Sequence, residues 1–145
     1  MKITTNRKHL EFKCSQLNYT DALKAVIQLM EVALYPQHKD CIGLAHNQIR
    51  GNKAVFIAKI NKKWRAFINP EITFYSKENF KHSESCMSFP NKHNKVVRHN
   101  KVILRHETQE GFIKEEFTGF NACIIQHEID HLDGKHIFNK EEITK

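Results

Sequence analysis

Long apolar runs, paired cysteines and glycine- or proline-rich stretches are all scarce in this sequence. No stretch approaches the roughly 18 apolar residues that a membrane-spanning helix needs, and residues 1–13 contain no apolar run of signal-peptide length. The four cysteines are widely spaced and include no Cys-x-x-Cys pair, which argues against a disulfide-stapled secreted scaffold and favours reduced thiols. We therefore expect a soluble, cytoplasmic protein.

Length and charge limit the remaining possibilities. A chain of 145 residues can bury an independent core without disulfides, so we expect a single domain over residues 1–145. The formal net charge of +7 would attract RNA, but the lysines are dispersed and no nucleic-acid-binding module is recognisable. The sequence therefore gives no reason to expect DNA binding.

The apolar pattern predicts a helix, a series of short strands and a second helix. The first helix has Thr20 as its N-cap and continues to about Leu34. Its predicted core face consists of Leu23, Val26, Ile27, Met30 and Leu34. The predicted strands are residues 54–58, 64–68, 72–75, 96–98, 102–106 and 112–117. The last helix covers about residues 118–133, with Gly134 as its C-cap.

This order predicts an α+β fold. Short antiparallel or mixed sheets would pack around the C-terminal helix, and an amphipathic helix would stand near the N-terminus.

The C-terminal helix carries a His-Glu-x-x-His motif. His127 and His131 are four residues apart, so they lie on one face of a helix, and Glu128 lies on the neighbouring face. This arrangement is typical of metallohydrolases, in which the histidines bind the metal and the glutamate activates water. A catalytic site of this kind usually has three protein ligands, so one ligand is still missing.

The third ligand could lie on either side of this helix. Downstream, His136 nearly fits the longer pattern in which a glycine turn returns a third histidine, but it stands one residue too close to the glycine. Glu141 and Glu142 are the other downstream candidates and lie close to the terminus. Upstream, Cys86 stands in a polar segment ahead of a proline-containing turn. We predict Cys86 as the third ligand.

Residues 41–48 add a further candidate region. Gly43 permits a close approach of the backbone to a ligand. Gln48 could donate a hydrogen bond to an oxyanion that develops during a reaction.

Together, the three segments resemble the peptide deformylase family. The family signatures are G-x-G-L-A-A-x-Q, E-G-C-L-S and Q-H-E-x-D-H-L-x-G, and this chain reads C-I-G-L-A-H-N-Q, E-S-C-M-S and Q-H-E-I-D-H-L-D-G in the same order. The third signature is matched at every fixed position, and the resemblance covers about residues 5–138. The departures are Cys41, His46, Ser85 and Met87.

The resemblance implies a metal-dependent hydrolase that removes the formyl group from N-formylmethionine of newly made polypeptides and releases formate. Cys86, His127 and His131 would hold one divalent metal ion. Fe(II) is common in the family, and Zn, Ni or Co also suit such ligands. Glu84 would pair with Arg98 and brace the segment that carries the metal ligand, as the corresponding residues do in relatives.

The resemblance also implies roles around the metal. Glu128 would act first as general base and then as general acid, while Gln48 and the backbone N–H of Met87 would stabilise the oxyanion. The substrate-binding residues implied in this way are Gly43, Leu44, Cys123 and Ile124. The implied partners are N-formylmethionyl peptides and, transiently, the ribosome, with no DNA and no membrane.

Two alternatives remain open. In a non-catalytic deformylase-like binding protein, His46 and Cys41 would block the cleft. In a small metalloprotease, His136 would complete the metal site. The intact Gln48 and Glu128 favour the enzyme over the binding protein, and the position of His136 disfavours the protease.

Overall fold

The structure is a computed structural model, and it describes residues 1–140. The predicted alternatives Glu141 and Glu142 lie outside the described residues. The helices are α1 (Arg7–Leu10), α2 (Tyr19–Ala33) and α3 (Gly119–Leu132), with 3-10 helices η1 (Pro36–His38) and η2 (His46–Ile49). The strands are β1 (Gly43–Ala45), β2 (Val55–Ile60), β3 (Lys63–Tyr75), β4 (Asn79–Cys86), β5 (Phe89–His99), β6 (Lys101–Thr108) and β7 (Gly111–Thr118).

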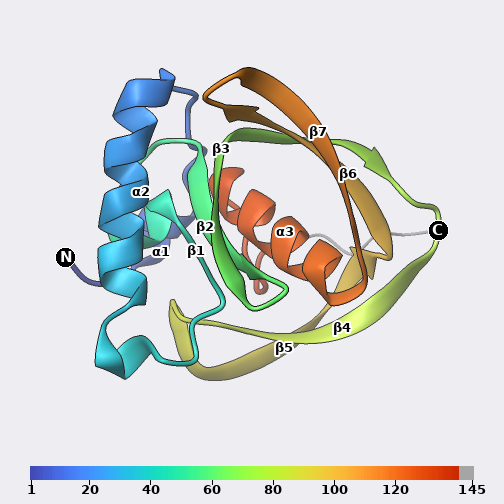
Figure 1. Cartoon of the computed structure of the whole chain (residues 1–145). Coiled ribbons are helices and arrows are strands. Elements are labelled where there is room, and N and C mark those ends of the chain that lie inside the picture. Colours follow the sequence, from blue (N-terminus) through green and yellow to red (C-terminus); the bar gives the residue numbers. More distant parts are fainter. Residues whose placement is uncertain (141–145) are drawn as a thin grey trace.

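Two antiparallel sheets surround helix α3. Strands β1, β2, β3, β6 and β7 form one sheet in that order, and β4 pairs with β5 in a separate two-stranded sheet. Figure 1 shows α3 between these sheets, with α2 on the outer side of β1 and β2. The predicted α+β arrangement around a C-terminal helix is confirmed. No helix within residues 1–140 has the length and apolar character needed to cross a membrane.

Helix α2 begins earlier than predicted. Its N-cap is Asn18 rather than Thr20, and the Asn18 side chain accepts a hydrogen bond from the backbone N–H of Asp21 at 2.8 Å. Asparagine is as good an N-cap as threonine or better, so the sequence offered two competing start signals.

The face that α2 buries also differs from the prediction. The buried residues are Ala22, Ala25, Leu29, Val32 and Ala33. Of the predicted core face, Leu23, Ile27 and Leu34 are exposed by 43 %, 59 % and 63 %, whereas Val26 and Met30 are partly buried. The helix carries two apolar stripes, and the one rich in alanine lies against the sheet. Periodicity alone did not distinguish them.

The strand predictions were right in place but wrong in extent. The predicted strands 64–68 and 72–75 are parts of one long strand, β3, whose pairing with β6 shifts register on either side of residues 71–72. Pro70 lies at the first of these irregularities, where a missing backbone N–H disturbs the ladder least. Strand β4 was missed because it is mostly polar and buries only Glu84 and Cys86.

Helix α3 forms the centre of the protein. Thr118 is its N-cap, as the predicted boundary implied, and ten of its residues are buried. Gly134 follows the C-cap Asp133 with a φ of 76°, and a Cβ there would come within 2.9 Å of the backbone of Phe12. A helix enclosed in this way can hold side chains in fixed positions.

Candidate metal centre

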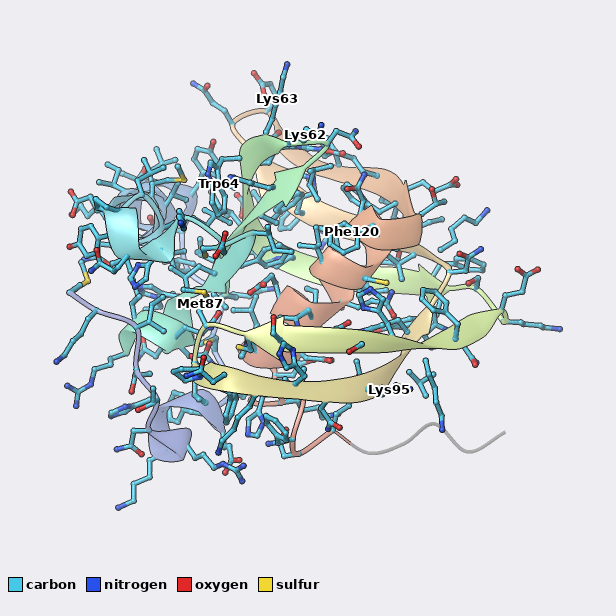
Figure 2. The ribbon with its side chains drawn as sticks, turned by 90° about the horizontal axis from the view of Figure 1, so that it is seen from below. Lys62, Lys63, Trp64, Met87, Lys95 and Phe120 are labelled. Carbon is cyan, nitrogen blue, oxygen red and sulfur yellow. The ribbon has the colours of Figure 1, made fainter. Side chains whose placement is uncertain are left out.

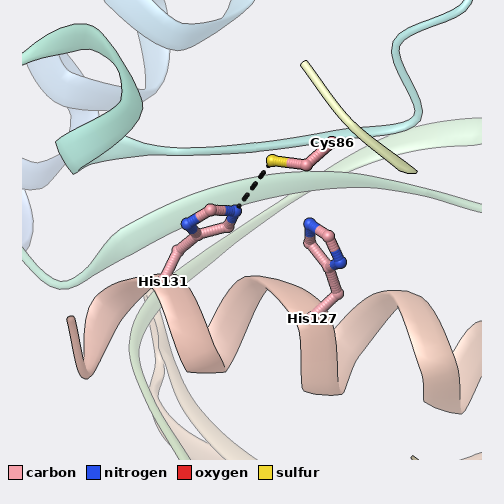
Figure 3. A group of neighbouring side chains, drawn as sticks. All are labelled: Cys86, His127 and His131. Carbon is pink, nitrogen blue, oxygen red and sulfur yellow. Dashed lines mark hydrogen bonds between the residues drawn. The ribbon is translucent and has the colours of Figure 1, made fainter. Parts of the chain in front are cut away.

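A thiol and two imidazoles converge between strand β4 and helix α3 (Figure 3), and the side chains of Cys86 and His127 line a cavity. Cys86 ends strand β4, and His127 and His131 project from α3 on successive turns. One ligand atom from each residue lies within 4.8 Å of the others, and Cys86 Sγ is 3.3 Å from Nε2 of His131. One sulfur and two nitrogen donors fit a single divalent metal ion of the zinc or iron type.

A buried carboxylate orients one of the two imidazoles. Nδ1–H of His127 donates to Oε1 of Glu84 at 2.8 Å, which turns the other ring nitrogen toward Cys86. Arg98, 1 % exposed, donates to both oxygens of Glu84 at 2.7 and 2.8 Å and to Asp130 at 2.6 Å. The predicted pairing of Glu84 with Arg98 is therefore present.

Glu84 is ionised in this setting. Burial by itself would raise the pKa of its carboxyl group, but the hydrogen bonds from Arg98 and His127 outweigh burial and hold the pKa well below its usual range. Carboxylates that hold a metal-binding histidine in this way fix its tautomer and its direction.

Glu128 lies beside strand β1. It is 3 % exposed, and its Oε1 has no hydrogen-bond partner within residues 1–140. Burial is the main cause that raises the pKa of this carboxyl group to about 7. A Cβ on Gly43 would collide with the Glu128 carboxylate, so any side chain at this position would force the carboxylate to shift. An acid that titrates near neutrality can both accept and donate a proton.

The Gln48 amide is held next to Cys86. Its Oε1 accepts a hydrogen bond from the backbone N–H of Ala45 at 3.0 Å, and its Nε2 donates to Oγ of Ser88 at 3.1 Å. The same Nε2 lies 3.5 Å from Sγ of Cys86. Met87 follows Cys86 in the turn between β4 and β5 and lines the same cavity (Figure 2). Two donors predicted for the oxyanion therefore border the thiol.

The cavity above these groups has a volume of about 830 Å³. Gly43, Cys123 and Ile124, three of the four residues predicted to bind substrate, line it. The side chain of Leu44 does not: it is fully buried in the core beneath α2. Phe120, at the start of α3, lies at the rim of the cavity and is 58 % exposed.

The two unusual residues of the first motif leave the cleft open. His46 points away from the cavity, with Nε2 3.3 Å from Oε1 of Gln28 and Nδ1 accepting from the backbone N–H of Lys53 at 3.1 Å. Cys41 lines the cavity wall, but its thiol donates to the backbone carbonyl of Gly43 at 3.3 Å. Burial raises the pKa of Cys41 to about 12, so it stays protonated.

Two histidines outside the candidate metal triad of Cys86, His127 and His131 have clear structural positions. His136 is 2 % exposed, and its Nε2 lies 2.7 Å from Oε2 of Glu11. This ring nitrogen therefore bonds to Glu11 and does not belong to the metal triad. His82 was not predicted to be functional. It stands two residues before Glu84, on the same face of β4, and its Nδ1 lies 2.9 Å from Oε2 of Glu84. The i, i+2 spacing on a strand is the signal that could have identified it.

Comparison with known proteins gives one consistent answer. The model of the polypeptide deformylase family matches residues 2–144. A peptide deformylase of Thermotoga neapolitana is 35% identical over 128 residues, which are 88% of this chain and 77% of the relative.

Solved structures agree with the sequence matches. A crystal structure of peptide deformylase from Thermotoga maritima has a TM-score of 0.82 at 26% identity, covering 93% of this chain and 92% of that one. The actinonin complex of the deformylase from Vibrio parahaemolyticus bacteriophage VP16T has a TM-score of 0.84 at 27% identity, covering 94% of this chain and 100% of that one.

Proposed function

Because the chain belongs to the polypeptide deformylase family and is a hydrolase of that family, we propose that Cys86, His127 and His131 form its metal-binding active centre. The reaction removes the formyl group from N-formylmethionine of newly made polypeptides and releases formate. The observation that best supports this assignment is the convergence of these three donors next to a cavity that Cys86, His127 and Glu128 line.

The protein contributes a proton carrier to the reaction. When bound, a divalent metal ion supplies Lewis acidity and makes water nucleophilic near neutral pH. Glu128, which lines the cavity beside His127, accepts a proton as water attacks the formyl carbon and then donates it to the departing amine. Gly43 permits this placement, because any side chain there would displace the carboxylate.

Two N–H donors stabilise the negative charge that grows on the formyl oxygen. One is Nε2–H of Gln48, whose amide is held in place by Ala45 and Ser88. The other is the backbone N–H of Met87. A single donor of this kind typically lowers the barrier by about 3 kcal/mol.

The substrate would bind along β1 and across the start of α3. The backbone of Gly43 would pair with the extended peptide, and Cys123 and Ile124 would contact the methionine side chain. Leu44 would contribute by anchoring β1 in the core, since its side chain does not reach the cavity.

We extend the proposal to the native metal and the setting. Fe(II) suits the mixed sulfur and imidazole ligands, and a thiolate bound to iron is open to oxidation, so activity should decay in air. The net charge of +7 supports a transient contact with the ribosome, and the four free thiols are compatible with the reducing cytoplasm. Residues 1–145 would then act as one catalytic domain.

The direct test is formate release from formyl-Met-Ala-Ser, measured without oxygen on metal-loaded protein. We expect activity in the wild type, at least a 100-fold loss in Glu128→Ala, and loss of both metal and activity in Cys86→Ala. Cys14→Ala is the matched control, because Cys14 is a buried free thiol outside the metal triad. Metal-loaded wild type that releases no formate would contradict the proposal, and full activity in Cys86→Ala would remove the thiol from the ligand set.

A further inference from the structure

His82 occupies a wall of the cavity beside the metal triad. It lies on β4, its side chain is 26% exposed, and it lines the cavity together with Cys123 and Ile124. Its ring meets Phe120 edge-on, with 6.0 Å between ring centroids, and approaches Phe80 in the same manner at 5.9 Å. An apolar side chain that entered this end of the cavity would contact the His82 ring.

The same ring belongs to a hydrogen-bonded chain that ends at a metal ligand. Nδ1–H of His82 donates to Oε2 of Glu84 at 2.9 Å, and Oε1 of Glu84 accepts from Nδ1–H of His127 at 2.8 Å. An ionised carboxylate can only accept, so both histidines must donate through Nδ1. Arg98 also donates to both oxygens, but it is 1% exposed, whereas His82 reaches the cavity.

We propose that His82 is both a positioning residue for the metal ligand His127 and a specificity-determining residue for the substrate side chain. Its N–H fixes the Glu84 carboxylate that orients His127. Its ring gives the cavity an aromatic wall against which a thioether sulfur packs better than a methylene group does. The specificity half rests on the proposed deformylase function, whereas the positioning half depends only on metal binding.

Three substitutions separate the two properties. His82→Asn keeps an N–H donor near the position of Nδ1 but removes the ring. His82→Phe keeps an aromatic ring but removes the donor, and His82→Leu removes both. The matched control is His93→Leu, because His93 lines the same cavity and is exposed. Each of the first two variants keeps one property and so serves as the folding control for the other.

Metal binding tests the positioning half. Co(II)-loaded proteins are mixed with a chelator, and the loss of the visible Co(II)–thiolate absorption is followed. We expect His82→Phe and His82→Leu to lose the ion about 10-fold faster than the wild type, the lower end of the effect seen for groups that orient a metal ligand. His82→Asn and His93→Leu should behave like the wild type. Unchanged rates in His82→Phe would overturn the positioning role.

Substrate selectivity tests the other half. The measured quantity is the ratio of kcat/KM for formyl-Met-Ala-Ser to that for the same peptide with norleucine, which replaces the sulfur by a methylene. We expect His82→Asn and His82→Leu to lower this ratio by about 2- to 10-fold and His82→Phe to preserve it. An unchanged ratio in His82→Leu would overturn the specificity role. If the wild type hydrolysed neither peptide, the proposed function would fail, yet the chelator experiment would still decide the positioning role.

Discussion

Replacing Glu128 by glutamine should stabilise the metal-free protein at alkaline pH. Glu128 is 3% exposed, and burial is the main cause that raises its pKa from 4.5 to about 7. One pKa unit corresponds to about 1.36 kcal/mol, so the cost of ionising this carboxyl group in the folded protein is about 3 kcal/mol. Glutamine has nearly the same shape and carries no charge.

The sign of the effect follows from proton linkage. The pKa of Glu128 is higher in the folded than in the unfolded state, so the folded state holds the proton more tightly. The contribution of the protonated group to stability is complete below about pH 4.5 and is lost as the pH rises toward 7. Glu128→Gln should therefore resemble the wild type near pH 4.5 and exceed its unfolding free energy by about 3 kcal/mol near pH 8.

Urea unfolding of chelator-treated protein at several pH values between about 5 and 8 measures this difference. Glu116→Gln is the control, because the Glu116 side chain is 56% exposed, and its effect should not change with pH in this way. A stability difference between the wild type and Glu128→Gln that stayed constant with pH would refute the reasoning. So would a wild type more stable than Glu128→Gln near pH 8.

Three further substitutions test other parts of the site. Gly43→Ala should bind metal normally yet lose at least 100-fold in kcat, because the added Cβ displaces the Glu128 carboxylate. Metal analysis together with formate release would check this, and near-normal turnover would contradict it. Arg98→Met should lower the free energy of unfolding by about 3–5 kcal/mol because it removes the buried guanidinium that pairs with both Glu84 and Asp130. Arg65→Met, at a partly exposed ion pair, should cost less than about 1 kcal/mol, and equal losses in urea unfolding would refute the distinction. His136→Leu should keep a full complement of metal, since the His136 ring bonds elsewhere, and metal loss on dialysis would revive it as a ligand.

Cys86, His127 and His131 could be named as candidate ligands from the sequence because each stands in a local motif. His127 and His131 are separated by one helical turn, and α3 formed close to the predicted boundaries because Thr118 and Gly134 mark its two ends. Cys86 was chosen as a thiol in a polar segment ahead of a proline-containing turn, and its family motif then supported the choice. The place where β4 meets α3 is a matter of tertiary packing that spacing alone does not reveal.

Other features depend on contacts between distant segments and could not be derived from local pattern. His46 looked like a residue that fills the cleft, yet its ring packs against Gly51 and bonds to Gln28 on α2. Leu44 belongs to a motif that borders the cavity, but strand alternation turns its side chain into the core. His82 is connected to His127 only through Glu84, which bonds to both histidines. Glu84 reaches His127 because β4 lies beside α3, and local sequence does not show this packing.

X-ray absorption at the zinc edge of protein loaded with one equivalent of zinc would test the proposed ligand set most directly. The account predicts one sulfur neighbour at about 2.3 Å and imidazole nitrogens at about 2.0–2.1 Å, with the sulfur shell absent from Cys86→Ala. A first shell of nitrogen and oxygen only, or a sulfur shell that survives in Cys86→Ala, would contradict it.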